Sequence, residues 1–256
     1  MSAGAPQGSE LHPLVGGFRD AAGYDRARPR YDASVVAELV EQLGLAQGAP
    51  VLELGAGTGQ LSGALLEAGL ELTAVEPLED TRELLAGTIG AERVRAGRAE
   101  EIPLPEASVQ AVLAADAFHW FDEQRAMPEI KRVLRPGGGV AILRTAPVLD
   151  TDWSRELGEM ITEVRPRHPA FDARPAAAAL EEDDAFGPVR ESTVTTRRDL
   201  DREAILALIA SFSWVATLAP EDRERLLSRA REVLDAHGVQ HESYDILHQI
   251  WTARLA

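Results

Sequence analysis

The sequence predicts an α/β protein organised around a mostly parallel β-sheet. From residue 33 to residue 146, short apolar runs alternate with stretches whose apolar residues recur at helical spacing. A glycine-rich turn directly follows the first apolar run, and a proline–glycine cluster at 135–139 separates two later elements. Strands that alternate with helices indicate βαβ units, whose right-handed crossovers place neighbouring strands in parallel.

The first half of the chain supports this fold element by element. Apolar residues recur at helical spacing across 31–43, and Gly44 ends that predicted helix. Strands are then expected at 51–54, 72–75, 93–95, 109–115 and 140–144, with helices at 61–68, 80–86 and 123–134 between them. Residues 135–139 are expected to form a turn, because Pro136 and the glycines after it end a helix.

The regular alternation stops after residue 146. Helices are predicted at 153–164, 202–212 and 220–236, the last with Pro220 in its first turn and Gly238 at its end. Strands are predicted at 191–196 and 244–252, whereas 165–188 receives no assignment. The chain has no repeat and no linker, so we expect a single domain, 1–256, with a core at 33–146 and a cover at 147–256.

The turn after the first predicted strand is the most informative segment. Gly55, Gly57 and Gly59 can bring the backbone close to a ligand, and the free N–H groups of the following helix favour an anionic or electron-rich partner. A dinucleotide turn would carry G-x-G-x-x-G, but Gln60 occupies the place of the third glycine. Glu76 ends the second strand about 20 residues downstream, where an acid commonly holds ribose hydroxyls.

Composition limits the classes of function. The chain has 256 residues, of which 45% are hydrophobic and 27% charged, as in a soluble globular protein. It lacks a long apolar run and a signal-peptide pattern, so a cytoplasmic location without membrane contact is expected. The net charge of −16 argues against a nucleic-acid partner. No cysteine is present and the histidines are not spaced as ligands, so no metal is expected.

Three segments together resemble one known family. The turn at 53–59 has the form E-x-G-x-G-x-G, which resembles motif I of class I S-adenosylmethionine (SAM)-dependent methyltransferases. The sequence FHWFD at 118–122, followed by VLRPGG at 133–138, resembles the small-molecule branch that includes trans-aconitate methyltransferase-like enzymes. Residues 24–31 resemble the Y-x-x-x-R-P-x-Y segment of that branch. The resemblance implies a Rossmann-like, doubly wound, mostly parallel seven-stranded sheet with an antiparallel final strand and a helical cover.

The resemblance also implies SAM as cofactor, S-adenosylhomocysteine as product, and a set of contacts. Glu76 aligns with the acid that contacts the SAM ribose, and Arg28 could pair with the SAM carboxylate. Arg98 and Ala99 lie in the loop that meets the adenine, where Arg98 replaces the usual acid. The predicted cofactor-binding residues are Arg28, Glu53, Gly55, Gly57, Gly59, Glu76, Pro77, Arg98, Ala99, Ala115 and Asp116.

The acceptor side is predicted from aromatic and titratable residues. His119 follows the fourth strand, and an ordinary pKa of about 6.5 suits a general base. Packing between its neighbours Phe118 and Trp120 is the alternative role for this histidine. The predicted substrate-binding residues are Phe18, Tyr24, Trp120, Trp153, His168 and Trp214.

These features predict methyl transfer from SAM to a small organic acceptor, at an O, N or C atom, in specialised metabolism. Two alternatives remain open: a SAM-binding enzyme that catalyses a non-methylating rearrangement or cyclisation, and a non-catalytic SAM-binding partner protein. An NAD-dependent dehydrogenase is disfavoured by Gln60 and by the VLRPGG segment. A small-molecule substrate is the expected partner, and the oligomeric state is left open.

Overall fold

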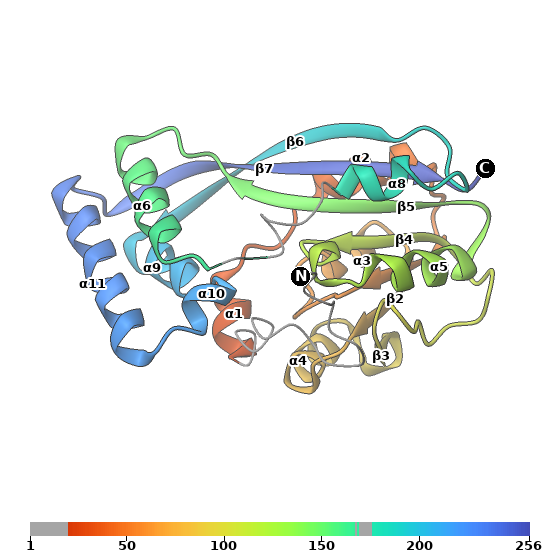
Figure 1. The fold of residues 1–256 in the computed structure, drawn as a ribbon, viewed down its shortest axis with the longest axis horizontal. Helices are drawn as coiled ribbons and strands as arrows, with labels where there is room; N and C mark the ends of the chain where they lie inside the picture. The colour runs from red at the N-terminus through yellow and green to blue at the C-terminus, as the bar shows by residue number, and fades with distance from the viewer. Residues whose placement is uncertain (1–19, 167, 169–175) are drawn as a thin grey trace, which may run out of the picture.

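The computed structural model describes residues 20–166, 168 and 176–256. A seven-stranded sheet runs through the molecule in the order β3-β2-β1-β4-β5-β7-β6 (Figure 1). Neighbouring strands from β3 to β5 pair in parallel, whereas β7 is antiparallel to β5 and to β6. The predicted seven-stranded, mostly parallel sheet with an antiparallel final strand is confirmed. The strands are β1 (Pro50–Leu54), β2 (Glu71–Glu76), β3 (Val94–Ala96), β4 (Val109–Ala115), β5 (Leu134–Pro147), β6 (Arg190–Asp201) and β7 (His241–Arg254).

Helices pack on both faces of this sheet, because its central strands are buried on both sides. On one face, α2, α3 and α4 enclose a core that contains Leu39, Leu65 and Leu113. On the other face, α5 and α8 enclose a core that contains Ile130 and Ile142. The helices of these two layers are α2 (Ala33–Leu43), α3 (Ser62–Glu67), α4 (Glu79–Ile89), α5 (Glu123–Val133) and α8 (Ala176–Glu181).

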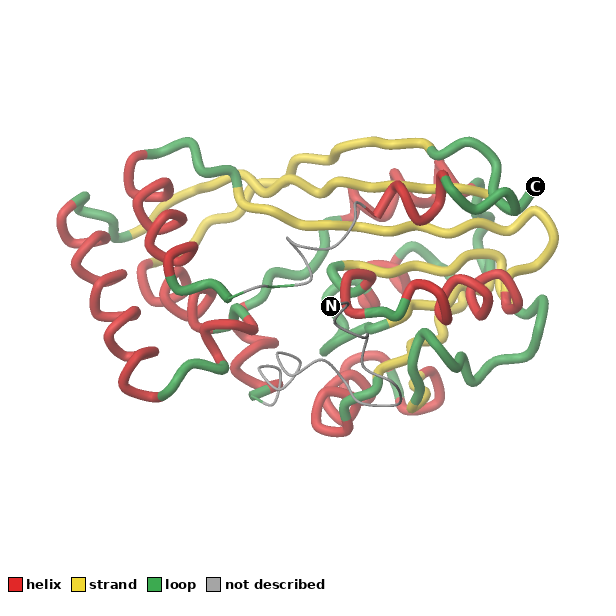
Figure 2. Tube along the Cα trace, in the orientation of Figure 1, coloured by secondary structure: helices red, strands yellow, loops and turns green. Residues whose placement is uncertain are grey.

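A third apolar cluster lies in the cover, beyond the carboxyl ends of the parallel strands. It joins α6, α9, α10 and α11 through residues such as Leu157, Ile209 and Leu226. Figure 2 shows these helices gathered at one end of the molecule, where the long strands β5, β6 and β7 extend to meet them. The cover helices are α6 (Asp152–Glu163), α9 (Arg202–Ala210), α10 (Ser213–Ala216) and α11 (Pro220–Ala236). The short helix α1 (Ala21–Ala27) contacts α9.

Strand β5 differs from the prediction at its start. The predicted turn at 135–139 lies inside the strand, which begins at Leu134 directly after α5. Val109 of β4 pairs with Leu134, but Ala111 pairs with Gly139, so the intervening residues of β5 form a bulge. The helix ends at Val133, before Pro136, as expected, but the glycines after Pro136 lie within β5 and not in a turn that precedes it.

The cover strands are longer than the sequence pattern indicated, because β6 and β7 pair along almost their whole length. Of the segment 165–188 that received no assignment, α8 is described, and 167 and 169–175 lie outside the described residues. Within the described part of the chain, no helix has the length and apolar character needed to cross a membrane.

Candidate functional site

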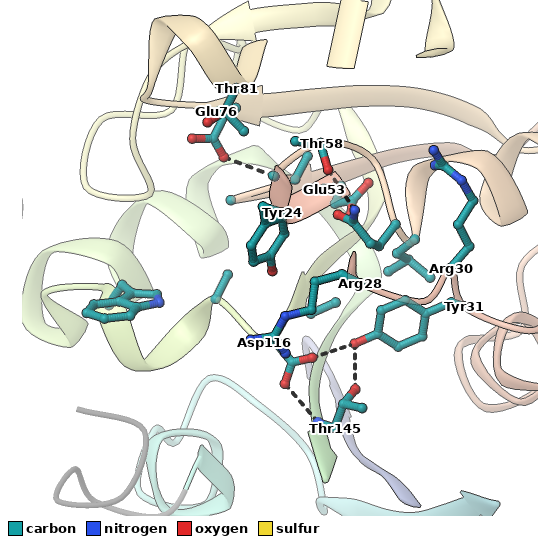
Figure 3. A pocket seen from close by; sticks show the side chains of 18 of the residues that line it. Tyr24, Arg28, Arg30, Tyr31, Glu53, Thr58, Glu76, Thr81, Asp116 and Thr145 are labelled. Atoms are coloured by element: carbon teal, nitrogen blue, oxygen red, sulfur yellow. Dashed lines mark hydrogen bonds between the residues drawn. The ribbon is translucent and has the colours of Figure 1, made fainter. Parts of the chain in front are cut away.

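A cavity opens at the carboxyl ends of β1, β2 and β4 and continues beneath the cover to β6 and β7. In a parallel α/β sheet this edge is the expected place for a ligand. Figure 3 shows Glu76 and Thr81 at one side of the cavity, Asp116 and Thr145 at the other, and Tyr24 between them. The cavity therefore joins the predicted cofactor motif to the cover in one continuous space.

The glycine turn presents its middle residue to this cavity. Gly57 has a φ of +59°, and a Cβ built there would meet only the Gln60 side chain, at 3.5 Å. At the other two positions, close packing explains why glycine is needed. A Cβ on Gly55 would lie 2.7 Å from the Ala117 Cβ, and one on Gly59 would lie 3.0 Å from Leu85. Gly59 does not line the cavity, unlike Gly55 and Gly57.

Glu76 connects the glycine turn to the end of β2. Its carboxylate accepts hydrogen bonds from the backbone N–H groups of Gly57 and Leu78, both at 3.0 Å. Burial raises the pKa of Glu76, while these N–H groups and the Arg82 guanidinium act in the opposite direction. A carboxylate has about four acceptor sites, so two backbone donors leave capacity for a ligand hydroxyl. Beside it, Thr81 is 4% exposed and its Oγ1 has no hydrogen-bond partner among the described residues.

Glu53 lies deeper than Glu76. It is 2% exposed, and its Oε2 accepts a hydrogen bond of 2.5 Å from Ser62 Oγ. Burial raises the pKa of Glu53 to about 8, although the Ser62 hydrogen bond acts against this shift and the Glu76 charge adds to it. At neutral pH this side chain is therefore mostly uncharged, at the base of the glycine turn.

Asp116 anchors the N-terminal segment to the end of the sheet. Its Oδ2 accepts from the Tyr31 hydroxyl at 3.0 Å and its Oδ1 accepts from the Thr145 N–H at 2.8 Å (Figure 3). Tyr31 Oη lies 2.9 Å from Thr145 Oγ1, which lies 3.3 Å from His248 Nδ1. Since both Asp116 oxygens accept from protein donors, its carboxylate ties Tyr31 of the N-terminal segment to Thr145 of β5.

Arg28 extends from the end of α1 towards the middle of the cavity (Figure 3). Its guanidinium lies over two aromatic rings, 5.3 Å from the centroid of Tyr24 and 4.8 Å from that of Phe212. These contacts hold the cation in place but leave its charge without a carboxylate partner among the described residues. The arrangement fits an anion such as the SAM carboxylate.

Most of the predicted site residues meet in this cavity. Of the predicted cofactor-binding residues, all line it except Gly59: Arg28, Glu53, Gly55, Gly57, Glu76, Pro77, Arg98, Ala99, Ala115 and Asp116. Of the predicted substrate-binding residues, Tyr24 and Trp120 line it. Phe18 lies outside the described residues.

His119 and three cover residues lie beside the cavity rather than in its lining. The His119 ring packs 5.0 Å from Trp120 and 5.9 Å from His168, measured between centroids. Burial lowers the pKa of His119 to about 3, with His168 and Arg144 adding to the effect. His168 is 3% exposed and lies 2.9 Å from Ser213 Oγ, and both Trp153 and Trp214 pack on the cover cluster. The general-base role of His119 stays a prediction, and its position favours packing.

Several lining residues carried no sequence signal. Thr81 is an ordinary residue of α4, and Arg198, Tyr244 and His248 belong to two strands that are distant from the motifs. The three strand residues reach the cavity because β7 pairs with β5 and β6 pairs with β7. The sheet order is the signal that could have found these three. Among the residues that the structure describes, no cluster of His, Asp and Glu has the form of a metal site.

Known proteins that are similar to this chain are methyltransferases by name. A family model described as a methyltransferase domain matches residues 52–142. An uncharacterized methyltransferase of Mycobacterium tuberculosis is 37% identical over 221 residues, which is 86% of each chain. A structure from Anaeromyxobacter dehalogenans, assigned as a type II methyltransferase, is 24% identical, covers 89% of this chain and 97% of its own, and has a TM-score of 0.63.

A further structural neighbour contains the product of the cofactor. It is a phosphoethanolamine N-methyltransferase of Haemonchus contortus with S-adenosylhomocysteine, 14% identical, with a TM-score of 0.53 over 98% of this chain and 61% of that one. None of these proteins identifies the trans-aconitate methyltransferase-like branch, which stays a prediction. The motif, the strand order and the 37% identity over most of the chain agree: this chain belongs to the methyltransferases, as a class I SAM-dependent enzyme.

Proposed function

We propose that the protein methylates a small organic molecule that enters beneath the cover, with SAM bound across the carboxyl ends of β1, β2 and β4. The observation that carries this proposal is the single cavity, which is lined by the glycine turn at one end and by cover residues at the other. A small acceptor in the cover end of this cavity would therefore lie next to a cofactor bound at the glycine turn.

We assign the cofactor contacts by combining the resemblance to the family with the residues that line the cavity. Glu76 and Thr81 would hold the ribose hydroxyls, since one offers acceptors and the other an unpaired buried hydroxyl. Ala99 and Arg98 would meet the adenine, and Arg28 would pair with the carboxylate of the methionine part. When bound, SAM supplies an electrophilic methyl group on a positively charged sulfur.

The chain's own residues would then align the acceptor with that methyl group and exclude water. Orientation of two reactants in this way can lower a barrier by about 7–11 kcal/mol. The rings of Tyr24, Trp120 and Phe212 line the space where an acceptor would lie. An acceptor atom that carries no proton at pH 7 needs no base, so the proposal does not depend on His119.

The test is calorimetric titration of the purified protein with S-adenosylhomocysteine, SAM and NAD⁺. We expect micromolar binding of the two sulfur ligands and none of NAD⁺. In Gly57→Arg, the new side chain would enter the cavity and abolish this binding. Gly48→Arg is the matched control, because Gly48 also has a positive φ, +75°, but is exposed and lies outside the cavity.

Two results would contradict the proposal: no binding of either sulfur ligand, or equal losses in the two glycine variants.

Mass spectrometry of the product distinguishes methyl transfer from the remaining catalytic alternative. Methyl transfer adds one methylene unit to the acceptor, whereas a rearrangement or cyclisation leaves its mass unchanged. A protein that binds SAM but converts no molecule in a broad acceptor screen would favour the non-catalytic alternative.

A further inference from the structure

The cover end of the cavity combines apolar side chains with one cation. Leu208 of α9, Phe212 and Ile246 of β7 supply apolar surface. Arg198 of β6 lies opposite Tyr244 of β7 in the strand register, and both side chains line the cavity. This end is built from a different part of the chain than the glycine turn.

Arg198 is held in place but is not neutralised. Its guanidinium donates a hydrogen bond to the backbone carbonyl oxygen of Arg30. In residues 20–166, 168 and 176–256 it has no ion-pair partner, and its buried Nε–H has no acceptor. A guanidinium has five donors, and the described residues engage one of them.

The acidic side chains near Arg198 do not form an ion pair with its guanidinium. Asp32 is exposed and its carboxylate accepts from the Ser34 N–H at 2.9 Å. Asp116 is engaged by Tyr31 and Thr145. The neighbouring Arg197, on the exposed side of the same strand, does pair with a carboxylate, that of Asp245. In a chain with 42 acidic and 26 basic residues, a cavity-lining arginine without an acidic partner stands out.

Arg28 and Arg198 reach the cavity from different elements. Arg28 follows α1 and is sandwiched with the rings of Tyr24 and Phe212, within the segment that folds over the glycine turn. Arg198 comes from β6, on the far side of the sheet order from β1 and β2. Burial raises the pKa of Tyr244, and the charges of both arginines oppose that shift. Both cations therefore act on this end: Arg28 belongs to the N-terminal segment, and Arg198 comes from β6 and contacts that segment through the Arg30 carbonyl oxygen.

We propose that the acceptor carries an anionic group, a carboxylate or a phosphate, which pairs with Arg198 while its apolar body lies against Leu208, Phe212 and Ile246. This inference deepens the proposed function and rests on it. A guanidinium binds both anions through two parallel N–H···O bonds, and a half-buried guanidinium strengthens such bonds. Arg198 would thus determine which acceptors enter, rather than take part in methyl transfer.

In the experiment, the protein is first saturated with S-adenosylhomocysteine. It is then titrated calorimetrically with each of three probes of similar size. These are 3-phenylpropanoate, phenyl phosphate and the neutral 3-phenylpropanamide. We expect at least one anion to bind about tenfold or more tightly than the amide, as a charge-assisted pair would give. The preferred anion tells a carboxylate acceptor from a phosphate acceptor.

Variants locate the effect. Arg198→Gln should reduce the affinity for the preferred anion to that of the amide, and Arg198→Lys should give an intermediate affinity. Arg197→Gln, on the same strand but outside the cavity, should leave all three affinities unchanged. Titration with S-adenosylhomocysteine alone shows that each variant is folded and that its cofactor site is intact.

Three outcomes would overturn the inference. If the anions bind no better than the amide, or if Arg198→Gln leaves their affinity unchanged, the inference fails while the proposed function stands. If Arg198→Gln weakens S-adenosylhomocysteine instead of the anions, Arg198 belongs to the cofactor site. If wild-type protein does not bind S-adenosylhomocysteine at all, the proposed function and the inference fail together.

Discussion

The two ends of the cavity are built in different ways. The strand-end side uses backbone geometry: a turn with Gly57 at positive φ, and two backbone N–H groups directed at Glu76. The cover side uses side chains such as Arg198, Phe212 and Tyr244 from elements that are far apart in sequence. The first end therefore suits a ligand that does not vary, and the second can change its acceptor through a few substitutions.

The largest expected effect is a loss of stability, and it tests whether the core of the sheet and the cover helices unfold together. Leu113 in the core is fully buried and Leu226 in the cover is 2% exposed. Replacing either by Ala should lower the free energy of unfolding by about 2–5 kcal/mol. If the chain is one cooperative domain, both variants shift a single transition measured by calorimetry.

Exposed leucines in the same two regions provide the controls. Leu84, 37% exposed on α4, and Leu149, 44% exposed before α6, should each change stability by less than about 0.5 kcal/mol when replaced by Ala. A separate early transition in Leu226→Ala, with the main transition unmoved, would show that the cover is an independent domain.

The second effect concerns the cofactor end alone. Glu76→Ala removes the buried acceptor that we assign to the ribose, so the affinity for S-adenosylhomocysteine should fall about 10- to 100-fold, as for hydrogen bonds to a charged group. The affinity for anionic acceptor probes, measured with saturating S-adenosylhomocysteine, should change much less. Glu79→Ala, an exposed acid in the first turn of α4, is the control in the same calorimetric titration. Equal affinities in Glu76→Ala and wild type would refute the assignment.

A third effect is a pH dependence of stability that arises at the base of the glycine turn. The pKa of Glu53 is raised from 4.5 to about 8, so the folded state retains a proton that the unfolded state loses. Its contribution to stability is complete below pH 4.5, decreases as the pH rises to 8, and is constant above that value. Within this window the slope is about 1.4 kcal/mol per pH unit at most.

Urea unfolding at several pH values tests this. Glu53→Gln cannot ionise, so it should gain stability relative to wild type as the pH rises from 5 to 8, with a difference that vanishes towards pH 4.5. Glu67→Gln, an exposed residue of α3, should follow wild type throughout. Curves for Glu53→Gln and wild type that stay parallel across this range would show that Glu53 ionises normally.

The core and its motif could be predicted because they depend on local pattern. A buried parallel strand is a continuous apolar run, and a tight strand–helix turn needs glycine, so Val51–Gly59 could be assigned without any partner strand. Ten of the predicted cofactor-binding residues line the cavity; three of them belong to this strand and turn, and most of the others were placed by the resemblance to the family. Their contacts with SAM stay predictions.

The rest of the site depends on long-range pairing that no local pattern reveals. Arg198 lines the cavity only because β6 pairs with β7 and β7 inserts between β6 and β5. For His119, the position after a strand led to the prediction of a general base. In the structure, the rings of Trp120 and His168 pack against it. Residue type and order along the chain could not distinguish a histidine in the cavity lining from one beside it.

The length of the cover strands has a mechanical consequence. β5 and β7 each have 14 residues and β6 has 12, and these strands run from the core to the cover helices (Figure 1). A hinge motion between core and cover would have to bend the three paired strands β5, β7 and β6. These strands therefore resist a rotation of the whole cover. We therefore expect ligands to enter and leave by displacement of residues 20–32, which reach the sheet end through the Tyr31–Asp116 hydrogen bond.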